Sequence, residues 1–106
     1  MVKVMYVLKP KAGVSRAEFQ KQWLEVHAPI LKKIPNLKRY VINVFQPRPD
    51  TTAADVGGVA ELWFESQDEM KTALGSPDAV NARAHLQKFA EVAGHISGLV
   101  DEHIVV

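Results

Sequence analysis

The segment WLEVHAPI, from Trp23 to Ile30, contains the side chain best suited to chemistry. His27 stands four residues after Trp23 and three before Ile30, so on a helix it shares their apolar face. An imidazole titrates near neutral pH, and it can accept a proton, donate one or hold a substrate oxygen. We therefore take His27 as a candidate catalytic acid or base.

Pro29 affects how His27 is presented. Its ring nitrogen cannot donate to the carbonyl of Glu25, and it biases Ala28 away from helical geometry. The sequence therefore predicts that the helix ends or kinks next to His27. The carbonyl groups freed there also support a structural interpretation, in which His27 donates to one of them and closes the helix end. Both interpretations stay open.

Glu61 is the second catalytic candidate, because it lies in the middle of the apolar segment GVAELWFE. A carboxylate in a buried strand is costly unless it is paired or faces a wet cavity. With a raised pKa it would serve as an acid or base. The alternative is an ion pair with Lys3, with Arg39 or with a cation of a second subunit.

Four aromatic side chains are candidates for contact with a substrate: Trp23, Tyr40, Trp63 and Phe89. Tyr40 has the strongest claim, because a buried hydroxyl needs a hydrogen-bond partner. Regularly spaced aromatics are also what a hydrophobic core contains, so core packing is the alternative for each.

The other histidines, His85, His95 and His103, form no H-x-x-x-H or H-E-x-x-H pattern, and the chain has no cysteine. We therefore expect no metal site. No phosphate-binding glycine motif is present either, so we expect no cofactor. If haem did bind, His103 would be its best axial ligand.

Composition sets the class of protein. The chain has 106 residues, 47% hydrophobic and 24% charged, which is typical of one globular domain spanning 1–106. Its net charge of +1 gives no attraction to nucleic acid or anionic membranes. No apolar run is long enough to span a bilayer, and the N-terminal segment is too short for a signal peptide. We expect a cytoplasmic protein without nucleic-acid or membrane partners.

Hydrophobic periodicity and capping residues predict the elements. Ser15, Ser66 and Ser76 are expected to cap helices. The final helix is expected to carry its apolar stripe as far as Ala93 and to end at Gly94. The expected elements are strand 2–9, helix 15–34, strand 37–46, loop 47–55, strand 58–65, helices 66–75 and 76–94, and strand 98–106. This β-α-β-β-α-β order predicts an α+β, ferredoxin-like fold with a four-stranded antiparallel sheet.

Both faces of that sheet are expected to be apolar. In the third strand, Val59 and Trp63 lie on one face and Ala60 and Leu62 on the other. Two helical segments can cover only one face, and an uncovered apolar face favours association. The sequence therefore predicts a homodimer that is joined through its sheet faces.

Several of these residues together resemble the EthD domain family, one of the dimeric α+β barrel proteins. The resemblance covers nearly the whole chain. It rests on F-x-x-x-W-x-x-x-H-A-P (Phe19 to Pro29), Pro35, Leu37, Arg39-Tyr40, GVAELWF (58–64), Ser76-Pro77 and Phe89. It implies a ferredoxin-like subunit, a barrel-forming homodimer and a pocket between helices and sheet.

The family resemblance constrains chemistry less than fold. EthD is associated with an ether-degrading oxidation system, and members are often labelled reductases. Related members isomerise lactones or dehydrate polyketides, and wider relatives include cofactor-free monooxygenases and haem-degrading enzymes. His85 is a departure, because similar sequences tend to carry an acidic residue four positions before the late phenylalanine. We therefore include His85 among the candidate substrate-binding residues.

Two functions follow as hypotheses. In the first, the protein is a catabolic or tailoring enzyme for a small oxygenated or aromatic compound, of oxidoreductase type or a cofactor-independent acid/base enzyme. His27 and Glu61 would then be catalytic, with Trp23, Tyr40, Trp63, Phe89 and His85 around the substrate. In the second, it is a non-catalytic accessory protein that carries a ligand for an oxidative degradation system.

Overall fold

The computed structural model describes residues 1–46 and 56–106, with the backbone alone for 93–95. The loop predicted at 47–55 lies outside the described residues. The elements are β1 (Val2–Pro10), α1 (Arg16–Lys21), the π-helical segment η1 (Gln22–His27), α2 (Ala28–Leu31), β2 (Arg39–Val44), β3 (Gly58–Phe64), α3 (Gln67–Leu74), α4 (Pro77–Leu86) and β4 (Ala90–Val100).

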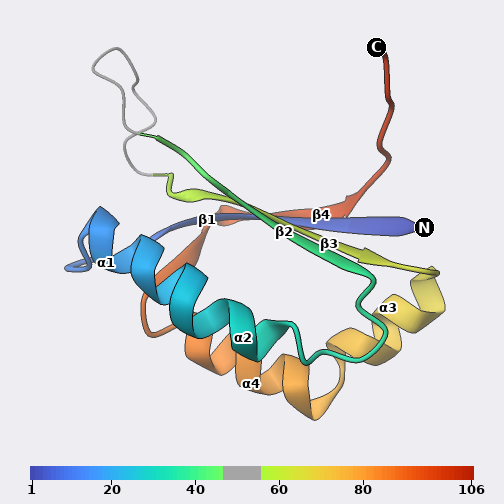
Figure 1. Ribbon diagram of the computed structural model, residues 1–106, viewed down its shortest axis with the longest axis horizontal. Helices are drawn as coiled ribbons and strands as arrows, with labels where there is room; N and C mark the ends of the chain where they lie inside the picture. The colour runs from blue at the N-terminus through green and yellow to red at the C-terminus, as the bar shows by residue number, and fades with distance from the viewer. Residues whose placement is uncertain (47–55) are drawn as a thin grey trace.

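The strands form one sheet in the order β2-β3-β1-β4, and every neighbouring pair is antiparallel. The helices all lie on one face of this sheet, where α2 packs beside α4 (Figure 1). This arrangement confirms the predicted ferredoxin-like α+β fold with four antiparallel strands.

The predicted helix caps are confirmed. The hydroxyl oxygen of Ser15 accepts a hydrogen bond from the Glu18 N–H at 3.1 Å. Ser66 and Ser76 accept in the same way from the amides three residues further on, each at 3.2 Å. Each cap satisfies an amide that the first helical turn leaves without an intrahelical partner.

The first helix does not end at Pro29. Instead it widens into η1, where the Ala28 N–H donates to the carbonyl of Trp23, five residues back. Pro29 then occupies the first turn of α2, where its missing N–H is tolerated, and the helix continues to Leu31. The prediction that the helix could end next to His27 is therefore wrong: the helix becomes π-helical before the proline and continues beyond it.

The C-terminal elements differ from those predicted. The helix α4 ends at Leu86 rather than Gly94, and Ala90, Ala93 and Gly94 lie in β4. This stretch pairs with the end of β1, Ala90 opposite Pro10, and that long-range pairing decides its conformation. Residues 101–106, predicted as strand, have no regular structure and are exposed.

The core fills the space between the helices and the inner face of the sheet. Its largest fully buried side chains are Trp23, Phe19, Phe64 and Leu62. The outer face of the sheet, which no described helix covers, carries Met5, Val7, Val41, Val59 and Trp63. Within the described residues, no helix has the length and hydropathy needed to cross a membrane.

Candidate functional site

A cavity of about 80 Å³ lies between the helices and the inner face of the sheet. Its walls are mostly apolar, with Leu62 from β3 and Leu86 from α4 among them. Its polar wall residues are Tyr6, Trp23, His27, Tyr40 and Arg83. An apolar pocket with a few convergent polar groups is the usual form of a small-molecule site.

Two polar atoms of this cavity wall have no partner within the described residues. They are the indole Nε1 of Trp23 and the hydroxyl oxygen of Tyr40, and both are buried. Burial raises the pKa of Tyr40 to about 12, and the nearby Trp23 indole opposes part of that rise without making a well-formed hydrogen bond to the hydroxyl. Both groups therefore remain N–H and O–H donors at neutral pH.

His27 ends η1 and is only 2% exposed. Its Nδ1 lies 3.1 Å from Nδ1 of His85 on α4, so its partner there is a side chain rather than a freed backbone carbonyl. Burial, with a smaller contribution from His85, lowers the pKa of His27 from 6.5 to about 4. The imidazole is therefore neutral at neutral pH.

The rings of Phe89 and His85 both contact the ring of His27. The two imidazole rings are nearly parallel, with their centroids 5.3 Å apart and 12° between their planes. The ring of Phe89 lies 5.5 Å from that of His27 and 5.4 Å from that of His85. The structure thus brings three predicted site residues together, and Phe89 packs against both histidines.

Tyr6 and Arg83 also line the cavity, although neither was predicted from the sequence as a site residue. Burial raises the pKa of Tyr6, and the charge of Arg83 opposes this rise. Arg83 also donates to the carbonyl of Leu74 at 2.9 Å. Side chains alternate along β1, so Tyr6 shares a strand face with the buried Leu8, and this alternation is the signal by which Tyr6 could have been found.

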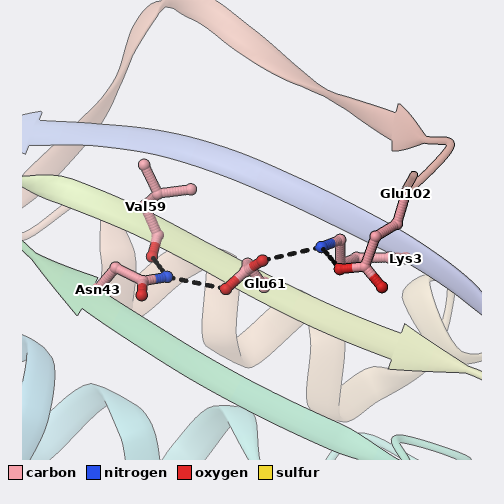
Figure 2. A network of polar contacts seen from close by, with 5 residues as sticks. All are labelled: Lys3, Asn43, Val59, Glu61 and Glu102. Carbon is pink, nitrogen blue, oxygen red and sulfur yellow. Dashed lines mark hydrogen bonds and ion pairs between the residues drawn. The ribbon is translucent and has the colours of Figure 1, made fainter. Parts of the chain in front are cut away.

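Glu61 lies on the outer face of the sheet, away from the cavity. Figure 2 shows its carboxylate between Asn43 and Lys3, with Glu102 on the far side of the lysine. Asn43 Nδ2 donates to Glu61 Oε2 at 2.9 Å, and Lys3 Nζ lies 3.0 Å from Oε1. The amide of Asn43, followed by Lys3, holds the pKa of Glu61 below its ordinary value. Its carboxylate is therefore ionised and paired at neutral pH.

Trp63 shares that outer face with Glu61. Its ring lies 4.7 Å from the guanidinium carbon of Arg39 and 5.0 Å from Lys3 Nζ, so it contacts two cations. Because side chains alternate along β3, Glu61 and Trp63 are separated by the sheet from His27. Within one subunit, the structure does not bring them into the cavity as the sequence analysis expected.

His103 lies exposed in the C-terminal segment, outside the cavity. Among the residues that the structure describes, no three histidine or carboxylate side chains converge as metal ligands. The side chain of His95 is outside that description.

This chain is similar to known proteins in sequence and in structure. One relative is an uncharacterized 11.0 kDa protein from the thcB-thcC intergenic region of Rhodococcus erythropolis, 31% identical over 70% of this chain and 71% of that protein. An EthD family protein from Bacillus halodurans has a similar structure, with a TM-score of 0.73 and 18% identity over 98% of this chain and all of that one.

Two further solved structures share the fold. One is SnoaB, a cofactor-independent oxygenase from Streptomyces nogalater, with a TM-score of 0.63 and 17% identity over 100% of this chain and 98% of that one. The other is a dimeric protein of unknown function and ferredoxin-like fold from Bacteroides fragilis, with a TM-score of 0.64 and 17% identity over 97% and 95%. The family model for the EthD domain matches residues 11–97, and the chain therefore belongs to the EthD domain family.

Proposed function

We propose that this protein binds a small oxygenated or aromatic compound in the cavity and that His27 transfers a proton to or from it. The observation that carries the proposal is the pair of buried, unpartnered donors, Trp23 Nε1 and Tyr40 Oη, in the cavity that His27 also lines. An unsatisfied buried polar group costs about 1–3 kcal/mol, so a ligand oxygen that accepts from these donors would recover that free energy.

The roles follow from the chemistry of each group. The Trp23 N–H and the Tyr40 O–H would hold a carbonyl, phenol or enolate oxygen of the ligand. As His85 occupies Nδ1 of His27, the Nε2 atom is the one left to exchange a proton with the ligand. The apolar wall around them would exclude water and strengthen each polar contact.

No tightly held cofactor is part of this proposal. The Streptomyces protein of the same fold is described as a cofactor-independent oxygenase, which supports chemistry carried by protein side chains. An oxidoreductase-type reaction and a cytoplasmic location stay predictions from the sequence.

The second candidate is a ligand carrier without catalysis. One observation favours it: the pKa of His27 is lowered to about 4, which makes a neutral but weak base. A carrier needs the donors of the cavity but no group that moves a proton. The two candidates therefore predict the same binding and differ in the fate of a ligand proton.

We also propose that two copies associate through the outer faces of their sheets. Exposed apolar side chains at the sheet include Phe45 after β2 and Ile96 on β4, which are 46% and 58% exposed. The Bacteroides protein with the same fold is dimeric, which supports this arrangement. In such a dimer, the paired Lys3 and Glu61 would lie at the interface.

Binding can be tested with the protein's own fluorescence, because the chain has two tryptophans. In a Trp63→Phe background only Trp23 emits, and titration with phenol, catechol or cyclohexanone should change its emission saturably. Tyr40→Phe should weaken binding by about 3- to 10-fold through loss of one hydrogen bond. Val80→Ala, an exposed change on α4, serves as the control and should bind normally.

Catalysis is tested by exchange of the α-hydrogens of cyclohexanone with deuterated water, followed by NMR. The protein should accelerate this exchange, and His27→Gln should remove the acceleration while retaining binding. Binding without acceleration would favour the carrier, whereas no saturable binding of any probe would overturn both forms of the proposal.

A further inference from the structure

The histidine pair connects the cavity with the surface of the protein. His27 lines the cavity and is buried, whereas His85 on α4 is only partly buried. Their Nδ1 atoms lie 3.1 Å apart, which is hydrogen-bond distance. The two rings thus form a continuous path from the site to solvent.

A hydrogen bond between the two Nδ1 atoms requires a single proton between them. A neutral imidazole carries its proton on one nitrogen and a lone pair on the other. If His27 donates from Nδ1, its Nε2 is a proton acceptor, and His85 carries its proton on Nε2. If His85 donates instead, both tautomers are reversed. The pair therefore has two neutral arrangements that differ in which outer nitrogen bears a proton.

Because His27 is buried, it can accept a proton from a ligand at low cost only if it passes another proton on. Since burial lowers the pKa of His27 to about 4, an imidazolium is costly at this position. A base that keeps the proton it takes would be weak here. If His27 releases its Nδ1 proton while it accepts a proton at Nε2, the ring never becomes positively charged.

We propose that His85 positions His27 and relays its proton, so that the pair carries a proton between the cavity and the protein surface. This inference rests on the proposed function, because it takes His27 Nε2 as the atom that meets the ligand. It extends that function by adding an outlet on α4 and a reason for a histidine at position 85.

The transfer balances without any other reactant. The ligand gives a proton to Nε2 of His27, the proton on Nδ1 of His27 passes to Nδ1 of His85, and His85 releases its Nε2 proton to water. The ligand loses one proton, water gains one, and both rings end neutral in the opposite tautomers. The reverse sequence restores the starting state and returns a proton to the ligand.

This reset limits the class of reaction. A relay that returns by running backwards suits chemistry in which a proton leaves one ligand atom and a proton is later delivered to another, as in an isomerisation or a keto-enol interconversion. The charged groups near the path are consistent with it. Burial, followed by the charge of Lys88, lowers the pKa of His85, which favours release of a proton to water, and Arg83 lines the cavity.

The surroundings hold the pair in line. The rings are nearly parallel, and Phe89 packs against both of them. Their positions come from two helices, the end of η1 and the last turn of α4, so neither ring depends on a loop. Rigid placement of this kind is what transfer over a single hydrogen bond requires.

The test is NMR of the ligand-free protein labelled with ¹⁵N in histidine. Nitrogen shifts report which ring nitrogen is protonated, and in the parent the fractions of Nδ1–H on His27 and His85 should add up to one shared proton. Two rings that both lack a proton on Nδ1 would overturn the proposal without any variant. Assignments come from His27→Gln and His103→Gln.

Exchange of the His27 ring proton with water distinguishes a relay from a cover. His85→Phe keeps an aromatic ring in place but removes the outlet, so exchange should slow at least about tenfold. His85→Glu supplies a group that can accept and release a proton, and it should restore the rate and hold His27 as the Nδ1–H tautomer. If exchange in His85→Phe is unchanged or faster, His85 is only a cover.

Failure here and failure of the proposed function are distinguishable. The NMR measurements contain no ligand, so they test the relay even if phenol, catechol and cyclohexanone do not bind. Conversely, probes that bind and exchange, together with unchanged exchange of the His27 ring proton in His85→Phe, would keep the proposed function and remove the relay.

Discussion

Lys3 Nζ lies 3.0 Å from Glu61 Oε1 on the face of the sheet that the helices leave uncovered. A second carboxylate, from Glu102, lies 2.7 Å from the same nitrogen. Lys3 is only 8% exposed. Because the ammonium group of Lys3 contacts little water, these two carboxylates stabilise its positive charge.

We expect Lys3→Met to destabilise the protein by about 1–3 kcal/mol, because Glu61 and Glu102 lose a charged hydrogen-bond donor. Chemical denaturation measures this change. Lys9→Met is the matched control, since Lys9 pairs with Glu91 at 3.1 Å but the two side chains are 37% and 55% exposed. That change should cost about 0–1 kcal/mol, and equal costs at both positions would contradict the prediction.

The effect of Lys3→Met should depend on pH. The pKa of Glu61 is held below its ordinary 4.5, so its contribution is present above that value and is lost as the pH falls through the folded-state pKa. The pKa of Lys3 is raised above 10.5, first by Glu102 and then by Glu61, so its contribution is present below 10.5 and is lost at higher pH. The two stability curves should therefore converge in acid and in alkali.

His27 should make the protein sensitive to mild acid. Its pKa is about 4 when folded and 6.5 ordinarily, so between these values the unfolded chain binds more protons and stability falls as the pH falls. The loss attributable to His27 is on the order of 3 kcal/mol between pH 7 and pH 4. His27→Gln does not titrate, and denaturation of both proteins across this range should show the parent losing more stability.

Gly58→Ala should disturb the cavity through Trp23. An added Cβ would collide with the backbone carbonyl of Asn43 and would lie 2.8 Å from the Trp23 ring. We expect a loss of about 1–3 kcal/mol in stability and an altered Trp23 emission. Gly98→Ala, at a strand position with open space around it, is the control. It should be neutral or slightly stabilising, and a similar loss there would point to strand propensity instead.

Trp63→Glu should prevent association of the sheet faces, because it places a charge in the apolar surface. Sedimentation velocity at micromolar concentration should find the parent as a dimer and the variant as a monomer. Val80→Glu changes an exposed apolar residue on α4, away from that face, and should leave the dimer intact. A monomeric parent would refute the proposed interface.

Local signals predicted the fold well. Each serine cap acts within three residues of its own position, so sequence spacing was sufficient. The predicted end of the final helix, at Gly94, was wrong because the apolar spacing of Ala90 and Ala93 fits a helical stripe, whereas pairing with β1 makes this segment a strand. That pairing joins residues about eighty positions apart, which no local pattern encodes.

The candidate site was predicted in part for a similar reason. Helical spacing placed Trp23 and His27 on one buried face, and the structure agrees. Alternation placed Glu61 and Trp63 together, but with both sheet faces apolar it could not indicate which face the helices cover. The contact between His27 and His85 depends on how two helices pack, and it was visible only in three dimensions.

The π-helical segment that ends in His27 also has a consequence for changes of chain length. It holds one residue more than an α-helical path between the same ends would need. Deleting a single residue between Gln22 and Val26 would let the segment return to α-helix without breaking it. In an ordinary α-helix each residue turns the chain by about 100°, so the same deletion would rotate one end of that helix against the other. An ordinary helix tolerates no such loss in its interior, whereas this one has a spare residue beside its catalytic candidate.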